Sequence, residues 1–291
     1  MKLEALKAVF APGRRLSTDD AVNISDVNIS DVFWAGEGYA AVKIPGFVAL
    51  QPHPIALAFG EGRRYSCADF EGQHDLLSKR STDRGRSWSA LNILVNVSMW
   101  GPDEAGPHGG AVWDITPVFD KVNAVLHVLF SRQPARYNKP CTDKPQCENE
   151  EYAYPQAREQ WELVSHDLGA TFSPPINRTS VLQGTWAASA CCVTFSGGKG
   201  VQLRNGSLLV PGYHCHSCEK RDCDPEAMHL WASHDFGRTW QVTPEFAFGC
   251  AEGEVAGTRR NDAVREHAHR RLRAKVPKPD DVALPPYDDE H

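Results

Sequence analysis

Ser81-Thr82-Asp83-Arg84-Gly85-Arg86-Ser87-Trp88 is the first of three related octapeptides in this chain. The second reads Ser-His-Asp-Leu-Gly-Ala-Thr-Phe over 165–172, and the third reads Ser-His-Asp-Phe-Gly-Arg-Thr-Trp over 233–240. The shared pattern S-x-D-x-G-x-[ST]-[WF] suits a tight turn between two strands, because Asp accepts bonds from backbone N–H groups and Gly tolerates positive φ. The closing aromatic ring can then be buried between neighbouring strands. Three copies predict a repeated β unit.

The chain around these octapeptides consists of short apolar runs separated by Gly, Pro, Asp and Ser. Residues 55–59 and 125–130 are two of these runs. Asn205-Gly206 lies between the runs 201–203 and 208–210, which is a strong hairpin signal. Short strands at regular spacing are typical of a sandwich, a barrel or a propeller. The sequence therefore predicts an all-β fold.

Composition divides the chain into three parts. Residues 1–31 carry no strong period and are interpreted as a variable lead-in, whereas 32–256 carry the strand pattern. Residues 257–291 form a tail that is basic and then rich in Pro and Asp. The tail lacks strand alternation, so we expect a helix followed by disorder, outside the repeated unit. Within the middle part, residues 134–160 predict a long surface loop.

Charge and hydropathy exclude several classes of partner. The formal net charge is −6, which gives no support to a nucleic-acid or anionic-membrane partner. No run of 18 apolar residues is present, so no transmembrane helix is predicted. No motif for a cofactor stands out, and we expect none.

Two features bear on the compartment. The chain has nine Cys, and five N-x-[ST] triplets begin at Asn23, Asn28, Asn96, Asn177 and Asn205. Together they favour a lysosomal or extracellular protein. Chance is the alternative, helped by the duplicated Asn-Ile-Ser-Asp at 23–26 and 28–31. The first ten residues make a poor signal peptide, because Glu4 and Lys7 interrupt the apolar stretch. A cytoplasmic location therefore stays open.

Residues 214–226 gather Cys and His in one segment. A zinc site there would use Cys215, Cys218, Cys223 and either His214 or His216. The second half of the usual paired-ligand spacing is missing. Disulfides or free thiols in a loop are therefore the favoured interpretation, and no metal site is predicted.

The octapeptides resemble the Asp box of the sialidase (neuraminidase) family. That resemblance implies a six-bladed β-propeller whose boxes lie on edge turns, away from the catalytic centre. Val42-Lys43-Ile44-Pro45 and 58–63 look like the family's [YF]-R-I-P and A-F-x-E-x-R strands. Residues 114–118 resemble its Asp-x-x-Pro-Val stretch, and 249–256 resemble N-E-x-Q-V-x-E. The match covers roughly 32–256, which corresponds to about four of six blades, so the chain looks truncated.

The resemblance implies an exo-α-sialidase, which removes terminal sialic acids from glycoproteins, glycolipids or oligosaccharides. The partner would then be a sialylated glycan. Its bond breaks through an oxocarbenium-like transition state. In this family three Arg hold the substrate carboxylate, since guanidinium groups bind carboxylates bidentately. An Asp acts as acid and then as base, and a Tyr activated by a Glu is the nucleophile.

Residue by residue, the resemblance assigns Asp69 as acid/base and Glu252 as the base that activates the Tyr. The residues implied in substrate binding are Lys43, Arg63 or Arg64, and Asp114, with Asp114 on the acyl side. Arg63 fits the family pattern better than Arg64. Asp69 as a simple turn residue is the alternative. Glu254 competes with Glu252, because strand alternation puts both on one face. Glu61 is expected to be a buried structural partner.

Two departures from the family pattern bear on activity. Lys43 replaces the first Arg, which keeps the charge and loses the bidentate fork. No residue matches the nucleophilic Tyr or the third Arg. We therefore expect very weak turnover or none from this chain. A non-catalytic propeller fragment that binds glycan or protein is the alternative function. An unrelated propeller hydrolase is a third interpretation, and the opening-blade resemblance argues against it.

Overall fold

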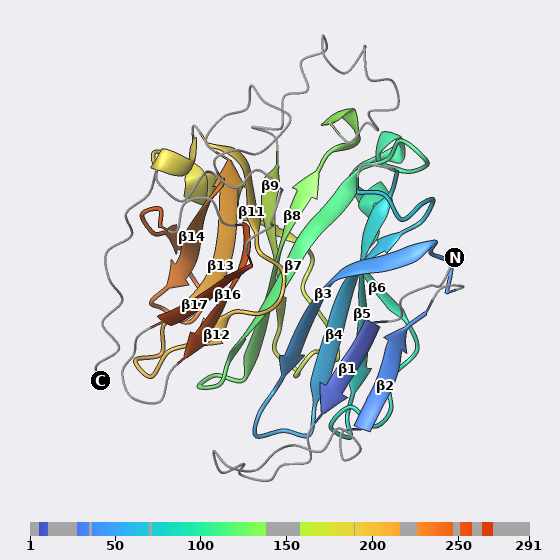
Figure 1. The fold of residues 1–291 in the computed structure, drawn as a ribbon, viewed down its shortest axis with the longest axis horizontal. Coiled ribbons are helices and arrows are strands. Elements are labelled where there is room, and N and C mark those ends of the chain that lie inside the picture. Colours follow the sequence, from blue (N-terminus) through green and yellow to red (C-terminus); the bar gives the residue numbers. More distant parts are fainter. Residues whose placement is uncertain are drawn as a thin grey trace, which may run out of the picture.

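The computed structural model describes residues 6–10, 28–34, 37–69, 72–137, 158–188, 190–215, 226–246, 251–257 and 264–269. Strands dominate these ranges, and the helical elements within them are short 3-10 turns (Figure 1). The all-β prediction is confirmed. No helix in the described ranges is long and apolar enough to cross a membrane.

The strands are β1 (Leu6–Phe10), β2 (Asn28–Phe33), β3 (Ala41–Ala49), β4 (Ala56–Arg63), β5 (His74–Ser81), β6 (Asn92–Val95), β7 (Ala111–Asp120), β8 (Val125–Gln133), β9 (Glu159–Ser165), β10 (Ile176–Asn177), β11 (Cys191–Phe195), β12 (Val201–Gln202), β13 (Leu208–Cys215), β14 (Glu226–Ser233), β15 (Gln241–Val242), β16 (Ala251–Gly257) and β17 (Val264–His269). The 3-10 turns are η2 (Val97–Trp100), η3 (Pro102–Glu104), η4 (Ala135–Tyr137), η5 (Thr179–Leu182) and η6 (Trp186–Ala188).

One antiparallel four-stranded unit is repeated along the chain. β3 to β6 form the first unit and β7 to β10 the second, and a parallel contact between β5 and β7 joins them. In the third unit β11 and β12 both pair with β13, so its first strand is interrupted. Figure 1 shows the three sheets in succession, with the β16–β17 hairpin beside β13. This is the propeller-type arrangement that the Asp boxes implied.

The hydrophobic core lies between successive sheets. Leu57, Phe59 and Val128 belong to the cluster between the first and second sheets. Leu129 follows Val128 directly in β8 and packs on the other side, with Phe195 of the third sheet. Neighbouring residues of a strand face opposite sides. β8 is therefore buried on both faces, which explains why its sequence reads as a continuous apolar run.

Each Asp box forms the turn between the third and fourth strands of its sheet. In the first box the Ser81 hydroxyl accepts a bond from the Gly85 N–H at 2.7 Å. Asp83 accepts bonds from the N–H and the hydroxyl of Ser87 at 2.9 and 2.6 Å. These bonds, led by that from the Ser87 hydroxyl, lower the pKa of Asp83 to about 2. The boxes at 165–172 and 233–240 repeat the same bonds.

The second and third boxes also pack against the preceding sheet. Phe172 meets Phe59 of β4 edge-on, with ring centroids 6.5 Å apart. Trp240 meets His127 of β8 in the same way at 6.1 Å. Trp240 is buried, whereas Phe172 and Trp88 are half-buried. The three aromatic residues therefore lie at equivalent turn positions, as the repeat predicted.

The tail differs from the sequence-based expectation where the structure describes it. Val264–His269 form strand β17, antiparallel to β16, so the predicted helix is wrong for this segment. Pairing with β16 supplies backbone hydrogen bonds that local preference does not anticipate. Residues 258–263 and 270–291 lie outside the described residues.

Two other boundaries also differ in detail. β1 and β2 form an antiparallel ribbon, so the lead-in contains a strand and the expected boundary at residue 32 falls inside β2. β9 begins at Glu159, so the end of the predicted surface loop 134–160 belongs to the second sheet. Residues 138–157 of that loop are outside the described residues. The division into 1–31, 32–256 and 257–291 stays a prediction.

The third sheet buries a pair of histidines. The Nδ1 atoms of His214 and His229 lie 3.2 Å apart, and His214 Nε2 lies 3.2 Å from Glu245 Oε1. Trp186 packs on both rings. Complete burial, and secondarily the neighbouring His214, lower the pKa of His229 to about 3.

These contacts bear on the zinc alternative. Cys215 is disulfide-bonded, and His214 interacts with Glu245 and His229. A disulfide-bonded Cys has no thiolate to offer a metal, which agrees with the favoured disulfide interpretation. Cys218, Cys223 and His216 lie outside the described residues.

Gly169 tests the packing of the second box. It has φ of +77°, and an added Cβ would lie 2.5 Å from Leu57 Cδ2. We expect Gly169→Ala to lower the free energy of unfolding by about 2–4 kcal/mol, combining left-handed strain with overpacking. Gly184 is the matched control, since its φ is +72° and an added Cβ would meet nothing within 4 Å. Gly184→Ala should cost only about 1–2 kcal/mol. Equal losses in urea unfolding would contradict the packing role of the box.

His229 predicts a pH dependence of stability. Its pKa is lowered from 6.5 to about 3 in the folded chain, so below pH 6.5 the unfolded chain binds a proton that the folded chain does not. Stability is then lost as the pH falls, at up to about 1.4 kcal/mol per pH unit. We expect His229→Gln to lack this part of the slope. Parallel curves of unfolding free energy against pH for the two proteins, between pH 7 and 5, would refute it.

Candidate active site

The innermost strands of the three sheets are irregular at the same level. The pairing register shifts after Lys43 in β3, after Trp113 in β7 and before Thr194 in β11. Ile44 and Asp114, which lie in the first two shifts, have φ of 47° and 53°. A bulge of this kind redirects side chains and is enriched beside active sites. The bulges therefore mark one level of the fold where side chains gather.

Arg63, at the end of β4, connects a buried carboxylate to an exposed one. Its Nη2 lies 3.0 Å from Glu61 Oε2, and its Nη1 lies 2.6 Å from Asp69 Oδ1. Nη1 also donates to the Cys67 carbonyl at 3.0 Å, which holds the loop. Arg63 and Glu61 have no exposed surface, whereas the Asp69 side chain is 56% exposed. The guanidinium is thus held from the buried side by Glu61 and covered on its other side by the exposed Asp69.

Glu61 carries the contact to the second sheet. Its Oε1 accepts the Asp114 backbone N–H at 2.9 Å, so β4 and β7 are joined at the bulge. Asp114 Oδ2 in turn accepts the Thr194 hydroxyl at 2.6 Å, which links β7 to β11. Burial and the nearby Asp114 carboxylate raise the pKa of Glu61, and Arg63 opposes them. Glu61 is the buried structural partner that the sequence predicted.

Trp113 and Arg158 belong to the same cluster, and the sequence analysis did not find them. The Arg63 and Arg158 guanidinium carbons lie 5.7 and 5.3 Å from the Trp113 ring centroid. Arg158 Nη1 lies 3.6 Å from Asp114 Oδ2. Trp113 directly precedes a predicted site residue, which was the available signal. Arg158 fell within the predicted surface loop, and only its position before β9 brings it to the site.

Lys43 lies on the same side of the first sheet as Arg63. It is the cross-strand partner of Glu61, and partners in a ladder point to the same face. Arg63 is two residues beyond Glu61 and so shares that face. Lys43 is exposed. Strand pairing therefore brings Lys43, Arg63 and Asp114 to one region.

Arg64 points away from this region. Its Nε lies 2.8 Å from Asp75 Oδ2, and Asp75 also accepts the Tyr39 hydroxyl at 2.8 Å. Asp75 pairs with Gly62, which lies between Glu61 and Arg63 and so faces the other side. Of the two arginines considered for substrate binding, Arg63 is therefore the one that faces the candidate site. The Tyr39–Asp75 pair, a tyrosine beside a carboxylate, also lies away from Asp69.

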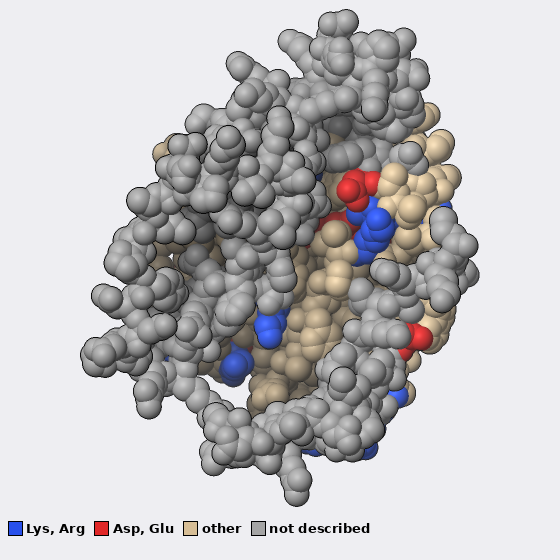
Figure 2. Space-filling model, in the orientation of Figure 1, with Lys and Arg blue, Asp and Glu red and all other residues tan. Residues whose placement is uncertain are grey.

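Glu252 and Glu254 lie in β16, which runs beside β13. Their side chains are outside the described residues, so their roles stay predictions. The remaining predicted site residues are described, and Figure 2 shows acidic and basic side chains in contact within one hollow of the molecule.

The Asp boxes lie at the opposite end of the strands from these residues. Arg63 pairs with His74 at one end of β5, whereas Ala56 pairs with Ser81, the first residue of a box, at the other. The two ends are about 24 Å apart, because a strand rises about 3.4 Å per residue over seven steps. The register thus separates the boxes from the candidate site.

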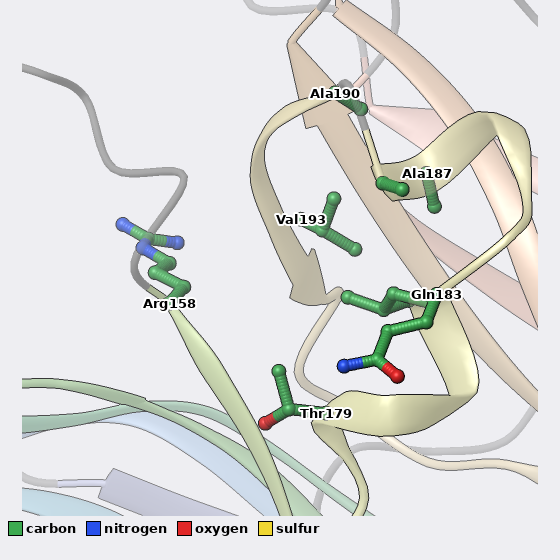
Figure 3. A pocket seen from close by; sticks show the side chains of 8 residues that line it. Arg158, Thr179, Gln183, Ala187, Ala190 and Val193 are labelled. Atoms are coloured by element: carbon green, nitrogen blue, oxygen red, sulfur yellow. The ribbon is translucent and has the colours of Figure 1, made fainter.

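A pocket of about 190 Å³ adjoins Arg158 on the side of the third sheet. Figure 3 shows Thr179 and Gln183 of the η5 region facing Val193 of β11 across it, with Ala187 and Ala190 nearby. Most of this lining is apolar, and Arg158 stands at the edge toward Asp114. The pocket can take a small group with an apolar end next to a hydrogen-bonding one.

Comparison with curated proteins identifies relatives. No family model matches the chain. Sialidase-3 of Mus musculus is 25% identical over 236 residues, which are 76% of this chain and 51% of that protein. Sialidase-2 of Rattus norvegicus is 26% identical over 251 residues, which are 81% of this chain and 60% of that protein. This chain is therefore similar to sialidases over most of its length. It spans 51% and 60% of these two relatives' lengths.

Solved sialidase structures share the fold. A Hadza microbial sialidase superposes with a TM-score of 0.63 at 20% identity, over 75% of this chain and 40% of that one. The Trypanosoma rangeli sialidase in complex with sialic acid gives 0.57 at 17% identity, over 88% of this chain and 38% of that one. These likenesses agree with the propeller fold inferred from the boxes.

The two carboxylate partners of Arg63 predict unequal costs of substitution. Glu61→Ala leaves a buried guanidinium without its buried partner, and we expect the free energy of unfolding to fall by about 3–5 kcal/mol. Asp69→Ala removes a partner that is 56% exposed and should cost no more than about 1 kcal/mol. Urea unfolding of both variants measures the difference. A larger loss for Asp69→Ala would show that the loop, rather than Glu61, holds Arg63.

Proposed function

We propose that this chain carries the part of an exo-α-sialidase that binds a terminal sialic acid and protonates the departing oxygen. The contacts that support this most directly are those of Arg63, which is held by buried Glu61 and paired on its other side with the exposed Asp69. A fixed guanidinium suits the carboxylate of a sialoside. The similarity to sialidases supports the substrate class, and the contacts of Arg63 support the choice of residues.

Arg63 and Lys43 would bind the substrate carboxylate. Lys43 contributes a point charge where the family has an arginine, so the grip is weaker and less directional. Arg63 Nη1 is occupied by Asp69 at 2.6 Å before substrate arrives. A substrate carboxylate that takes this position would release Asp69. The freed carboxylate would take up a proton from solvent, transfer it to the glycosidic oxygen as an acid and, again a carboxylate, act as a base in the later step.

Asp114 and the pocket at Arg158 would receive the acyl side of the sugar. Asp114 Oδ2 is held by Thr194, and the pocket beyond it is lined by small apolar side chains. Glu252 would activate a tyrosine nucleophile, as the family resemblance implies. These assignments require no cofactor.

A non-catalytic glycan-binding propeller is the second candidate. Lys43 favours it, because an ammonium group binds a carboxylate without the fork that orients it for reaction. The two candidates share the binding step and differ in turnover. Binding and hydrolysis must therefore be measured separately.

Binding of 3′-sialyllactose, measured by titration calorimetry, tests the site. We expect Lys43→Ala to weaken binding about tenfold, which corresponds to about 1.4 kcal/mol. Lys121→Ala is the matched control, an exposed lysine at the other end of β7, and should leave binding unchanged. Equal affinity of the Lys43→Ala and Lys121→Ala proteins would refute the placement of the carboxylate.

Hydrolysis of a fluorogenic sialoside separates the two candidates. We expect very weak turnover or none, because loss of one electrostatic contact to the transition state costs on the order of 10²–10³ in rate. Lys43→Arg should not restore turnover, since it supplies no nucleophile. Rates comparable to a full-length sialidase, abolished by Asp69→Ala, would establish the catalytic function and contradict this expectation.

A further inference from the structure

A second groove, of about 450 Å³, lies between the first two Asp boxes. Its lining includes Ser78, Arg80, Ser87, Trp88, Ser89 and Asn92 from the first sheet. Gly169 and Ala170 of the second box close the other side. The groove is therefore at the box end of β5, remote from Arg63 and Asp69.

Among the described residues, the guanidinium group of Arg80 is held in this groove through its Nε atom alone. Its Nε donates to the Leu168 carbonyl of the second box at 3.0 Å, and its backbone N–H donates to the Ser89 hydroxyl at 3.1 Å. Within the described part of the chain, no carboxylate pairs with its guanidinium. The contact with Leu168 orders the side chain and leaves the two terminal nitrogens for a ligand. A guanidinium ordered in this way binds an anion with a smaller loss of entropy.

The lining around Arg80 carries no negative charge of its own. The lining contains no acidic side chain. The nearby box carboxylates Asp83 and Asp167 are occupied by hydroxyls of their own turns, each at 2.6 Å. Arg84 and Arg86 are exposed on the same turn. Arg80, Arg84 and Arg86 thus outnumber the two box carboxylates at this edge, although the whole chain has a net charge of −6.

The rest of the lining suits a sugar. Trp88 is half-buried, with its ring 6.5 Å from that of Phe47, and it offers an aromatic surface for the apolar face of a sugar ring. The exposed carboxamide of Asn92 and the serine hydroxyls can bond to sugar hydroxyls. A peptide ligand would need apolar pockets for its side chains, which this mixed polar lining does not favour.

We propose that this groove is an accessory binding site for an acidic sugar residue, carboxylated or sulfated. Arg80 binds the anionic group, Trp88 packs against the ring, and Asn92 orients the hydroxyls. The site holds a glycan at the edge of the propeller without chemical change. It goes beyond the proposed sialidase function, because none of its residues belongs to the Arg63 cluster.

The test uses the full chain with Lys43→Ala and Asp69→Ala, two exposed changes that weaken the candidate active site. 3′-Sialyllactose, a 3′-sulfated lactose, lactose and hexaglutamate are each titrated by calorimetry. We expect both acidic sugars to bind and lactose to bind at least tenfold more weakly.

Adding Arg80→Gln to this protein should weaken the binding of the acidic sugars at least tenfold. Adding Arg86→Gln, an exposed arginine outside the lining, should change affinity less than twofold. Asn92→Ala is a second variant that removes no internal contact, and we expect about threefold weaker binding.

Three outcomes would overturn the proposal, each in a recognisable way. Equal losses for Arg80→Gln and Arg86→Gln would indicate diffuse charge attraction. Hexaglutamate that binds as tightly as the sugars would indicate an acidic-peptide surface. Binding that disappears with Lys43→Ala and Asp69→Ala alone would place all recognition at the candidate active site. Conversely, binding insensitive to those two changes but lost with Arg80→Gln would leave the accessory site standing while the proposed function fails.

Discussion

The Glu61 carboxylate is buried between two sheets and binds a partner in each. One oxygen takes the Arg63 guanidinium and the other takes the Asp114 backbone N–H. A buried carboxylate without such partners would cost several kcal/mol, so the two sheets must meet with Arg63 and Asp114 in place. The bond to Thr194 extends this constraint to the third sheet. The contacts that pack the sheets together are therefore the same contacts that assemble the candidate site.

Within the Arg63 cluster, the guanidinium is held in place while the Asp69 carboxylate can change its partner. Arg63 is held from the buried side, whereas Asp69 reaches it from an exposed loop. In the Arg63–Asp69 pair only the carboxylate is exposed, so Asp69 is the partner that solvent or a ligand can replace. The geometry thus gives a rigid anion-binding group beside a carboxyl group that can change partners. This arrangement supports the proposed binding of a sialoside, which is itself a carboxylate.

The Asp boxes stabilise the fold through bonds within each turn and through packing on the preceding sheet. Each turn satisfies its own polar groups, and the second and third boxes place their glycine and aromatic residue against the sheet before them. Because the turn bonds depend on a local pattern of eight residues, sequence was enough to find the boxes, whereas their contacts with the preceding sheet needed coordinates. The groove between the first two boxes needed coordinates, since Arg80 and Leu168 are 88 residues apart.

The sequence by itself determined the repeated β unit and the turn positions, and it predicted the set Lys43, Arg63, Asp69 and Asp114. Local hydrogen bonding and strand periodicity carry that information over a few residues. Only the tertiary structure decided that Arg63 rather than Arg64 faces the site, because adjacent residues differ only in the side they face. It also decided that Arg158 joins the cluster and that Val264–His269 pair with β16. Those contacts join segments far apart in the chain, and their energy depends on neighbours that no local pattern specifies.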